Sequence, residues 1–327
     1  MNTDELQKIR ILLSHSDRDH QLQGEALTSA LSEDEFAQLF RNSGFTHHYI
    51  GGGSRQAHSI SLKYDEWPAL QLQQDPLQFV ENNLATQFIV EGMFRVHKAT
   101  VSEMENLTFH GYSNLTNLDF LSDHPSVKWL NCASTSVTNI DGLRGISSLE
   151  DLDLSFCPIV DLSAVAAIPR LLFLRLHHNP NLTNASFEGL RGHPKLVEIH
   201  TKELKNLTSL SAFADMPRLI KLDLTAAANL TTLDGLKELP KLREVILYSC
   251  GSLTNLDALQ FCPALQLIDV STWDTYEPDW DQHFRGQNSL VSIEGILGLK
   301  HLKKVKLANQ EHIPKAQKIQ LREILVR

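Results

Sequence analysis

The sequence has only four cysteines among 327 residues, and it has no run close to the roughly 18 apolar residues that a membrane-spanning helix needs. So few cysteines exclude a disulfide-stabilised scaffold, and the missing apolar run excludes an integral membrane protein. The apolar core of a signal peptide is also absent, because Asp4 and Glu5 precede the first apolar residues and charges soon return. We therefore expect a cytoplasmic location.

Recognisable catalytic and metal-binding motifs are missing as well. The chain has no CxxC pair, HExxH motif, nucleophile elbow or Walker sequence. A glycine-rich run at 51–54 lacks the ending of a phosphate-binding loop, and a D-x-D-x-H run at 279–283 lacks the fuller spacing of a calcium loop. We therefore predict no catalytic residue, no cofactor and no metal site. If the chain is an enzyme, its chemistry is expected in residues 1–100. The only suggestive side chains there are four histidines: His47, His48, His58 and His97.

The charge of the chain is acidic overall but uneven. A net charge of −9 argues against a general nucleic-acid binder, and 42% hydrophobic with 21% charged residues excludes wholesale disorder. Residues 300–327 hold eight basic and two acidic residues, which leaves −15 on the rest of the chain. A solvated end is favoured over an interaction patch here.

The positive signal is an internal repeat. Its three clearest copies are SVTNIDGLRGISSLEDLDLSFC, NLTTLDGLKELPKLREVILYSC and SLTNLDALQFCPALQLIDVSTW. The apolar residue that opens each L-x-L recurs every 22 to 25 residues, until a last step of 37. We call these residues the strand starts and number other positions of a repeat relative to them: Leu107, Leu130, Leu152, Leu174, Ile199, Leu222, Val245, Ile268 and Val305.

The two halves of each repeat have different periods. The L-x-L half has period two, which predicts a short strand with one buried face. The preceding L-x-x-L-x-x-L half has period three, which predicts a 3₁₀ or short helical return. One repeat cannot bury its leucines alone, so stacked repeats must form the folding unit, with parallel strands lining a concave face.

This pattern resembles the short, 22-residue class of leucine-rich repeats found in bacterial internalins and in a eukaryotic phosphatase-regulatory subunit. The resemblance covers about residues 101–310. It implies an α/β solenoid, with a parallel concave sheet and a convex side of 3₁₀ or short helices. It also implies a protein-binding scaffold without catalytic residues.

The resemblance also accounts for the cysteines. In the family, the side chain at position +5 turns inward and hydrogen-bonds the backbone of the turn, and Asn179, Cys157 and Cys250 occupy that position. Cys132 and Cys262 fall at other apolar positions of the repeat. All four cysteines are therefore predicted to be buried and unreactive.

The repeats divide the chain into three parts. Residues 1–100 are expected to form a mostly helical cap or a small domain, because apolar residues recur at helical spacing and Ser32 with Glu35 forms a capping box. Residues 101–310 form the solenoid, with an insertion at 271–289. Residues 311–327 form a capping helix, with apolar contacts from Ile313, Ile319, Leu321 and Leu325.

Side chains at positions −1, +1 and +3 should point out of the concave face. Cross-strand pairs explain many of the polar ones: a ladder of Glu198, Lys221 and Glu244, and the pairs Asp153–Arg175 and His200–Asp223. The apolar side chains have no such explanation, so we predict that they contact a partner, unless a cap or the insertion covers them. The predicted contacts on this face are Trp129, Phe173, Arg175, His177, His200, Ile246, Tyr248 and Leu267.

The insertion is a second candidate for a binding surface. It places Trp273, Tyr276 and Trp280 among acidic residues. Insertions in repeat proteins emerge as loops and often lie on the binding face, so we predict that these aromatics contact the partner. The alternative is that they fold back over the neighbouring core.

Three functions remain, in order. The first is a non-catalytic scaffold whose concave face binds a protein or peptide partner. The second is an enzyme with a catalytic N-terminal region and repeats that select the substrate. The third is binding of a phospholigand or nucleic acid through the basic C-terminal end, which the acidic body makes the weakest.

Overall fold

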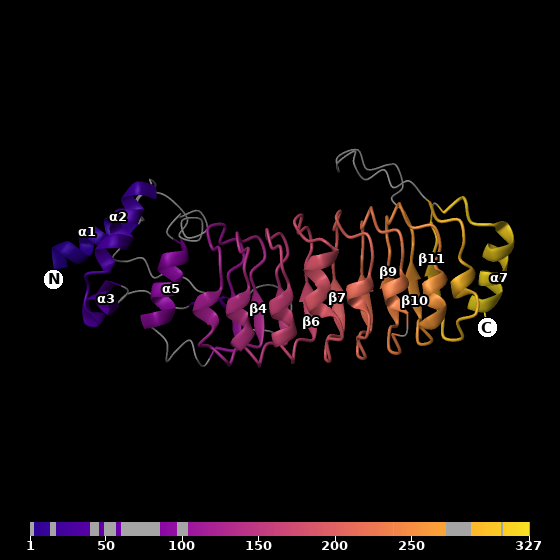
Figure 1. Ribbon diagram of the computed structural model, residues 1–327, viewed down its shortest axis with the longest axis horizontal. Helices are drawn as coiled ribbons and strands as arrows, with labels where there is room; N and C mark the ends of the chain where they lie inside the picture. The colour runs from indigo at the N-terminus through magenta and orange to yellow at the C-terminus, as the bar shows by residue number, and fades with distance from the viewer. Residues whose placement is uncertain are drawn as a thin grey trace. The chain divides into compact units, whose positions relative to one another are not determined.

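The computed structural model divides into two compact units, residues 1–149 and 150–327 (Figure 1). Three sequence predictions lie outside the residues that the structure describes: the glycine-rich run, the D-x-D-x-H run, and the insertion aromatics Trp273, Tyr276 and Trp280. The described residues are 3–13, 18–39, 46–48, 57–59, 86–96, 104–237, 239–272, 289–308 and 310–326. None of the helices among them is long and apolar enough to cross a membrane.

The first unit begins with helices and continues into the first repeats. Strand β1 pairs antiparallel with β2, and β2, β3 and β4 pair in parallel. The elements are α1 (Thr3–Leu13), α2 (Arg18–Thr28), α3 (Glu33–Leu39), β1 (Thr46–His48), β2 (Ala57–Ser59), α5 (Thr86–Val96), β3 (Asn106–Thr108), η2 (Asp119–Leu121), β4 (Trp129–Asn131) and η3 (Asp141–Gly145).

The predicted N-terminal helices are confirmed, with the expected cap on α3. The backbone N–H of Ser32 donates to Glu35 Oε2 at 3.0 Å, and that of Glu35 donates to Ser32 Oγ at 3.3 Å. This reciprocal pair satisfies amide groups that have no partner within the helix. Phe36 and Leu39 on α3 are buried, as is Ile9 on α1.

The second unit contains seven of the nine predicted repeat strands. Neighbouring strands from β5 to β11 pair in parallel, and 3₁₀ turns of successive repeats pack together in a second row (Figure 1). The elements are β5 (Asp151–Asp153), η4 (Ser163–Ala167), β6 (Phe173–Arg175), η5 (Asn184–Leu190), β7 (Glu198–His200), η6 (Ser211–Phe213), β8 (Lys221–Asp223), η7 (Asp234–Leu236), β9 (Glu244–Ile246), η8 (Asp257–Phe261), β10 (Leu267–Asp269), η10 (Glu294–Ile296), β11 (Lys304–Lys306) and α7 (Lys315–Leu325).

Each of the nine repeat strands is three residues long and is centred on a predicted strand start. The predicted fold class, parallel strands joined by 3₁₀ turns, is therefore confirmed. In the second unit the register places Leu174 beside Ile199 and Ile199 beside Leu222, all fully buried. Each such side chain contributes about 1.5–3 kcal/mol when it leaves water, and it does so only against its neighbours.

The structure confirms the burial of all four cysteines. At position +5, Asn179 Nδ2 donates to the Leu154 carbonyl at 3.0 Å, and its Oδ1 accepts from the Cys157 N–H at 2.8 Å. Cys250 Sγ donates to the Leu224 carbonyl at 3.2 Å, the equivalent of the Asn179–Leu154 bond in its own repeat. Burial raises the pKa of the Cys250 thiol to about 12, so this side chain stays protonated and inert at neutral pH.

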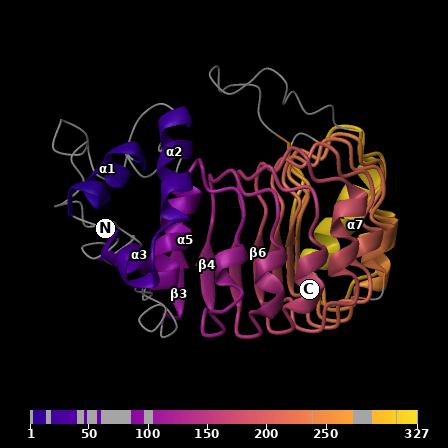
Figure 2. The same cartoon turned by 60° about the vertical axis from the view of Figure 1, so that its left-hand side comes forward.

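Helix α7 lies at the C-terminal end of the second unit (Figures 1 and 2). Ile313 just before it and Leu321 within it are buried, and Gln317 Oε1 accepts from the Ile293 N–H at 2.9 Å. The predicted contact from Ile319 is wrong, because that side chain is 56% exposed. Ile319 lies two residues from Leu321, about 200° around the helix, and so points away from the core.

The 3₁₀ turns pack so closely that some positions require glycine. A Cβ atom on Gly235 would lie 1.6 Å from the Leu210 carbonyl oxygen of the previous repeat, whereas one on Gly298 would meet nothing within 4 Å.

We therefore expect Gly235→Ala to lower the free energy of unfolding by about 1–3 kcal/mol, because the two repeats must separate. Gly298→Ala should be neutral or slightly stabilising, since it only restricts the unfolded chain. Urea denaturation of the two variants checks this, and equal stability would show that the turns can shift at no cost.

Candidate functional site

The strand face of the second unit, formed by positions −1, +1 and +3, is the candidate site. Every residue predicted to contact a partner there is half-buried, neither covered nor fully exposed: Phe173, Arg175, His177, His200, Ile246, Tyr248 and Leu267. Trp129, at position −1 of β4 in the first unit, is also half-buried. Their role as partner contacts stays a prediction.

The register separates the apolar side chains into two places. Leu267 lies beside Glu244 on β9, and Ile246 beside Asp269 on β10, so both apolar side chains belong to one pair of strands. Tyr248 follows two residues after Ile246. We call Ile246, Tyr248 and Leu267 the apolar patch. Phe173 lies apart from it on β6, between Asp151 and Glu198.

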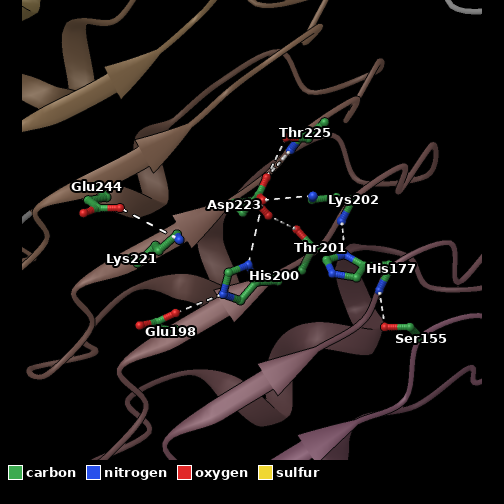
Figure 3. Close-up of polar contacts among 10 residues, drawn as sticks. All are labelled: Ser155, His177, Glu198, His200, Thr201, Lys202, Lys221, Asp223, Thr225 and Glu244. Carbon is green, nitrogen blue, oxygen red and sulfur yellow. Dashed lines mark hydrogen bonds and ion pairs between the residues drawn. The ribbon is translucent and has the colours of Figure 1, made fainter. Parts of the chain in front are cut away.

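Charged and polar side chains from the repeats of β5 to β9 are joined by hydrogen bonds and ion pairs, with the Lys221–Glu244 pair standing apart from the rest (Figure 3). We call this set the polar cluster. Its members are Ser155, His177, Glu198, His200, Thr201, Lys202, Lys221, Asp223, Thr225 and Glu244.

Asp223 lies at the centre of the polar cluster, with its side chain only 10% exposed. Its Oδ1 accepts from the Thr225 N–H at 3.0 Å and the Thr225 hydroxyl at 2.6 Å, and its Oδ2 lies 3.8 Å from both His200 Nδ1 and Lys202 Nζ. Burial alone would raise the pKa of Asp223, but the nearby His200 ring, the two hydrogen bonds from Thr225 and the Lys202 ammonium outweigh it and hold the pKa at about 2. The predicted His200–Asp223 pair is thus present, with an ionised carboxylate.

His200 lies between two carboxylates. Its Nε2 is 3.1 Å from Glu198 Oε2, on the side of the ring away from Asp223. The neighbouring hydroxyl does not face this ring, because Thr201 Oγ1 donates to the Asp223 carbonyl at 3.1 Å. The cluster therefore holds a histidine between acids, but no hydroxyl poised for attack with that histidine as its base.

His177 is held neutral by its surroundings. Its Nδ1 accepts a hydrogen bond from the Lys202 N–H at 3.2 Å, which requires an unprotonated nitrogen at that position. Burial lowers the pKa of His177 to about 4, and the positive charge of Lys202 adds to the effect. The backbone N–H of His177 donates in turn to Ser155 Oγ at 3.2 Å.

Acidic and amide side chains at position +1 hold the chain as it leaves each strand. Asp153, Asp223 and Asp269 each accept a hydrogen bond from the backbone N–H at position +3, at 3.0 to 3.1 Å, as does Asn131 in the first unit at 2.9 Å. Sequence reasoning missed this role, although the recurring D-x-S/T triplet is the signal for it.

The turn that follows has a positive φ at position +4, and it exposes an aromatic ring beside the strand face. Phe156, with φ of 59°, is 53% exposed and stacks on His178 at a ring-centroid distance of 4.4 Å. His178 Nδ1 lies 2.9 Å from Glu203 Oε2 in the next repeat. Phe156 was missed because position +4 lies outside the L-x-L alternation.

One predicted ion pair is wrong. Arg175 lies beside Asp153 in the register, but its guanidinium pairs with Asp151, with Nη1 2.5 Å from Oδ1. One oxygen of Asp153 accepts from the Ser155 N–H.

The predicted charge ladder is present in register but uneven in its pairing. Glu198 lies beside Lys221, and Lys221 beside Glu244. Lys221 Nζ is 3.9 Å from Glu244 Oε2, whereas Glu198 turns to His200. Among the residues of the described ranges, no group of three or more His, Cys, Asp or Glu side chains is arranged to hold a metal ion.

These features define a leucine-rich repeat fold. No protein-family model and no curated protein sequence matches the chain. It is similar to the solved structure of internalin C2 from Listeria monocytogenes, at 17% identity over 69% of this chain and 91% of that one, with a TM-score of 0.50. It is also similar to the leucine-rich repeat domain of the type III effector XopL, at 17% identity over 71% and 79%, with a TM-score of 0.51. These likenesses confirm the predicted fold.

The low pKa of His177 makes stability depend on pH. Between its ordinary value of 6.5 and the folded value of about 4, the unfolded chain binds a proton that the folded chain excludes. The free energy of unfolding should therefore fall as pH drops through this range, by about 1–2 kcal/mol for this partly exposed residue. His177→Gln, whose amide oxygen can still accept from the backbone, should remove that part, as measured by denaturation at about pH 7 and 4.5. Equal losses in both proteins would contradict it.

Asp223 and Asp153 offer a matched test of the polar cluster. Asp223→Ala removes the acceptor of two Thr225 bonds and the charge facing His200, so we expect unfolding to become easier by about 2 kcal/mol or more. Asp153→Ala removes one bond to Ser155 and should cost about 0.5–1.5 kcal/mol. Urea denaturation measures both, and a cost for Asp223→Ala no larger than that for Asp153→Ala would show that the cluster adds nothing to the turn.

Proposed function

We propose that the strand face of residues 150–327 binds a protein or peptide partner and performs no chemical step on it. The observation that carries the proposal is the apolar patch. Ile246, Tyr248 and Leu267 are half-buried at outward positions of two neighbouring strands, where folding does not require an apolar side chain. Aromatic and aliphatic side chains placed in this way are the usual anchors of protein interfaces.

The polar cluster supports the same function. Its charged side chains already pair with one another, as in Lys221–Glu244 and Lys202–Asp223, so binding need not order them. A face whose side chains are fixed in advance loses little conformational entropy when a partner docks. In this arrangement the apolar patch supplies affinity, and the charges around it discriminate between partners.

The resemblance to leucine-rich repeat proteins, which are mostly protein-binding scaffolds, supports the proposal as a class. It does not select a partner. Phe173 and Phe156 extend the proposed surface toward β5 and β6, where each contributes an aromatic ring.

The test is a differential capture experiment on two triple variants. Ile246→Ser, Tyr248→Ser and Leu267→Ser remove the apolar patch. Val160→Ser, Phe261→Ser and Val291→Ser change one aromatic and two aliphatic side chains that are exposed outside the strands. Both sets and the wild-type protein are immobilised, and proteins retained from a lysate of the source organism are quantified by mass spectrometry.

We expect a partner that the wild type and the control variant retain and the patch variant loses by about tenfold or more, because central apolar anchors dominate interface energies. Circular dichroism of both variants ensures that they are folded. A partner retained equally by all three proteins, or lost by the control variant alone, would contradict binding at the strand face.

A further inference from the structure

Four successive repeats carry a basic residue at position −4, in the turn that leads into the strand. Each follows a proline, and all four side chains are exposed. We call this row the basic edge. Its members are Arg170, Lys195, Arg218 and Lys241, which precede β6, β7, β8 and β9.

Backbone hydrogen bonds hold the four turns side by side. Two residues after each cation, the N–H of Val197 donates to Leu172, that of Ile220 to Val197, and that of Arg243 to Ile220, at 2.8 to 2.9 Å. Adjacent strands lie about 5 Å apart, so the four cations recur at close to that spacing. The preceding prolines restrict the backbone at each turn and keep the row regular.

Within the part of the chain that the structure describes, only one cation of the row has a carboxylate partner. Arg170 Nη2 lies 3.6 Å from Glu150 Oε1. Across the described ranges, no carboxylate forms an ion pair with Lys195, Arg218 or Lys241. Like charges on neighbouring repeats repel, so the row does not itself stabilise the fold.

The positive charge belongs to one edge of the repeats. Further cations continue it beyond the row, with Arg243 at position −2 of β9 and Lys300 and Lys303 before β11, all exposed. At the other end of the strands, positions +4 to +6 of the same four repeats hold one acid, Glu203, and one lysine, Lys205. The basic residues are therefore not spread evenly over the repeats but are concentrated at one end of the strands.

We propose that the basic edge binds an acidic segment of a protein partner in an extended conformation. Carboxylates on alternate residues of an extended chain recur about every 6.6–7 Å. The long, flexible lysine and arginine side chains of the row can spread from the roughly 5 Å spacing of their repeats to meet them. The site is separate from the apolar patch, so the proposal does not depend on the function proposed for that patch.

Two observations favour a protein segment over other polyanions. Positions −5 to −2 of the four repeats contain no aromatic side chain on which a base could stack, and the row is bordered by Glu198 and Glu244 within a chain of net charge −9. The same positions expose no large apolar side chain that would insert into a lipid surface.

The experiment measures binding of a fluorescein-labelled oligoglutamate peptide of about eight residues, long enough to span the row when extended. Fluorescence anisotropy at low salt compares the wild type with Lys195→Gln, Arg218→Gln, Lys241→Gln as one triple variant. The matched control is Lys205→Gln, Lys315→Gln, Arg322→Gln. Like the row variant, it removes two lysines and one arginine, but from exposed sites outside the row.

We expect the row variant to bind about tenfold or more weakly and the control variant within about twofold of wild type, with wild-type affinity falling as salt is raised. The patch variant, which combines Ile246→Ser, Tyr248→Ser and Leu267→Ser, should bind the peptide as the wild type does. This comparison tests the basic edge separately from the partner binding proposed for the strand face.

Three results would overturn the proposal. One is the absence of oligoglutamate binding by the wild type. Another is an equal loss in the row and control variants, which would show a general charge effect. The third is stronger binding of oligothymidylate or of phosphatidylserine vesicles than of the peptide, lost in the row variant, which would assign the row to nucleic acid or lipid.

Discussion

Stacking of each repeat on its neighbour is the constraint on which the rest of the structure depends. A strand of three residues, such as Phe173–Arg175, is too short to be stable alone, and its central Leu174 is buried only because Leu152 and Ile199 lie on either side. The same stacking fixes every other position of the repeat. Once the leucines are in register, outward side chains form columns across the strand face and turn residues form rows along its edges.

Within those columns the polar side chains form hydrogen bonds and ion pairs that belong to the fold itself and need no partner. The carboxylate of Asp223 accepts the amide of its own turn while it faces His200 from the next column position. A buried acid of this kind stays ionised because several donors surround it, which is why its pKa is low although burial opposes that shift. Most charges on the strand face are therefore part of the fold, and the side chains without such a role stand out against them.

The spacing of apolar residues predicted the positions that burial determines, such as the strand centres. It did not predict the positions that turn geometry determines. All nine strand centres followed from the apolar period, and α3 followed from its capping box, because both are local patterns in sequence. The exposed ring of Phe156 depends on a positive φ that no periodic rule encodes. The choice of Asp151 rather than Asp153 as the partner of Arg175 is visible only in three dimensions. The basic edge can be identified in the sequence, but only when each cation is aligned by its position in the repeat.

The apolar patch and the basic edge differ in the step of association that each would influence. Exposed charges act over about a Debye length and mainly change how fast partners meet, whereas desolvated apolar anchors mainly change how slowly they part. The repeat of β9 contributes to both surfaces, with Lys241 in the turn before the strand and Tyr248 two residues after it. Because one backbone register sets both positions, the spacing between the two surfaces is fixed by the repeat. A partner that contacts both would need an acidic segment and an apolar segment separated by the length of one strand and its entry turn.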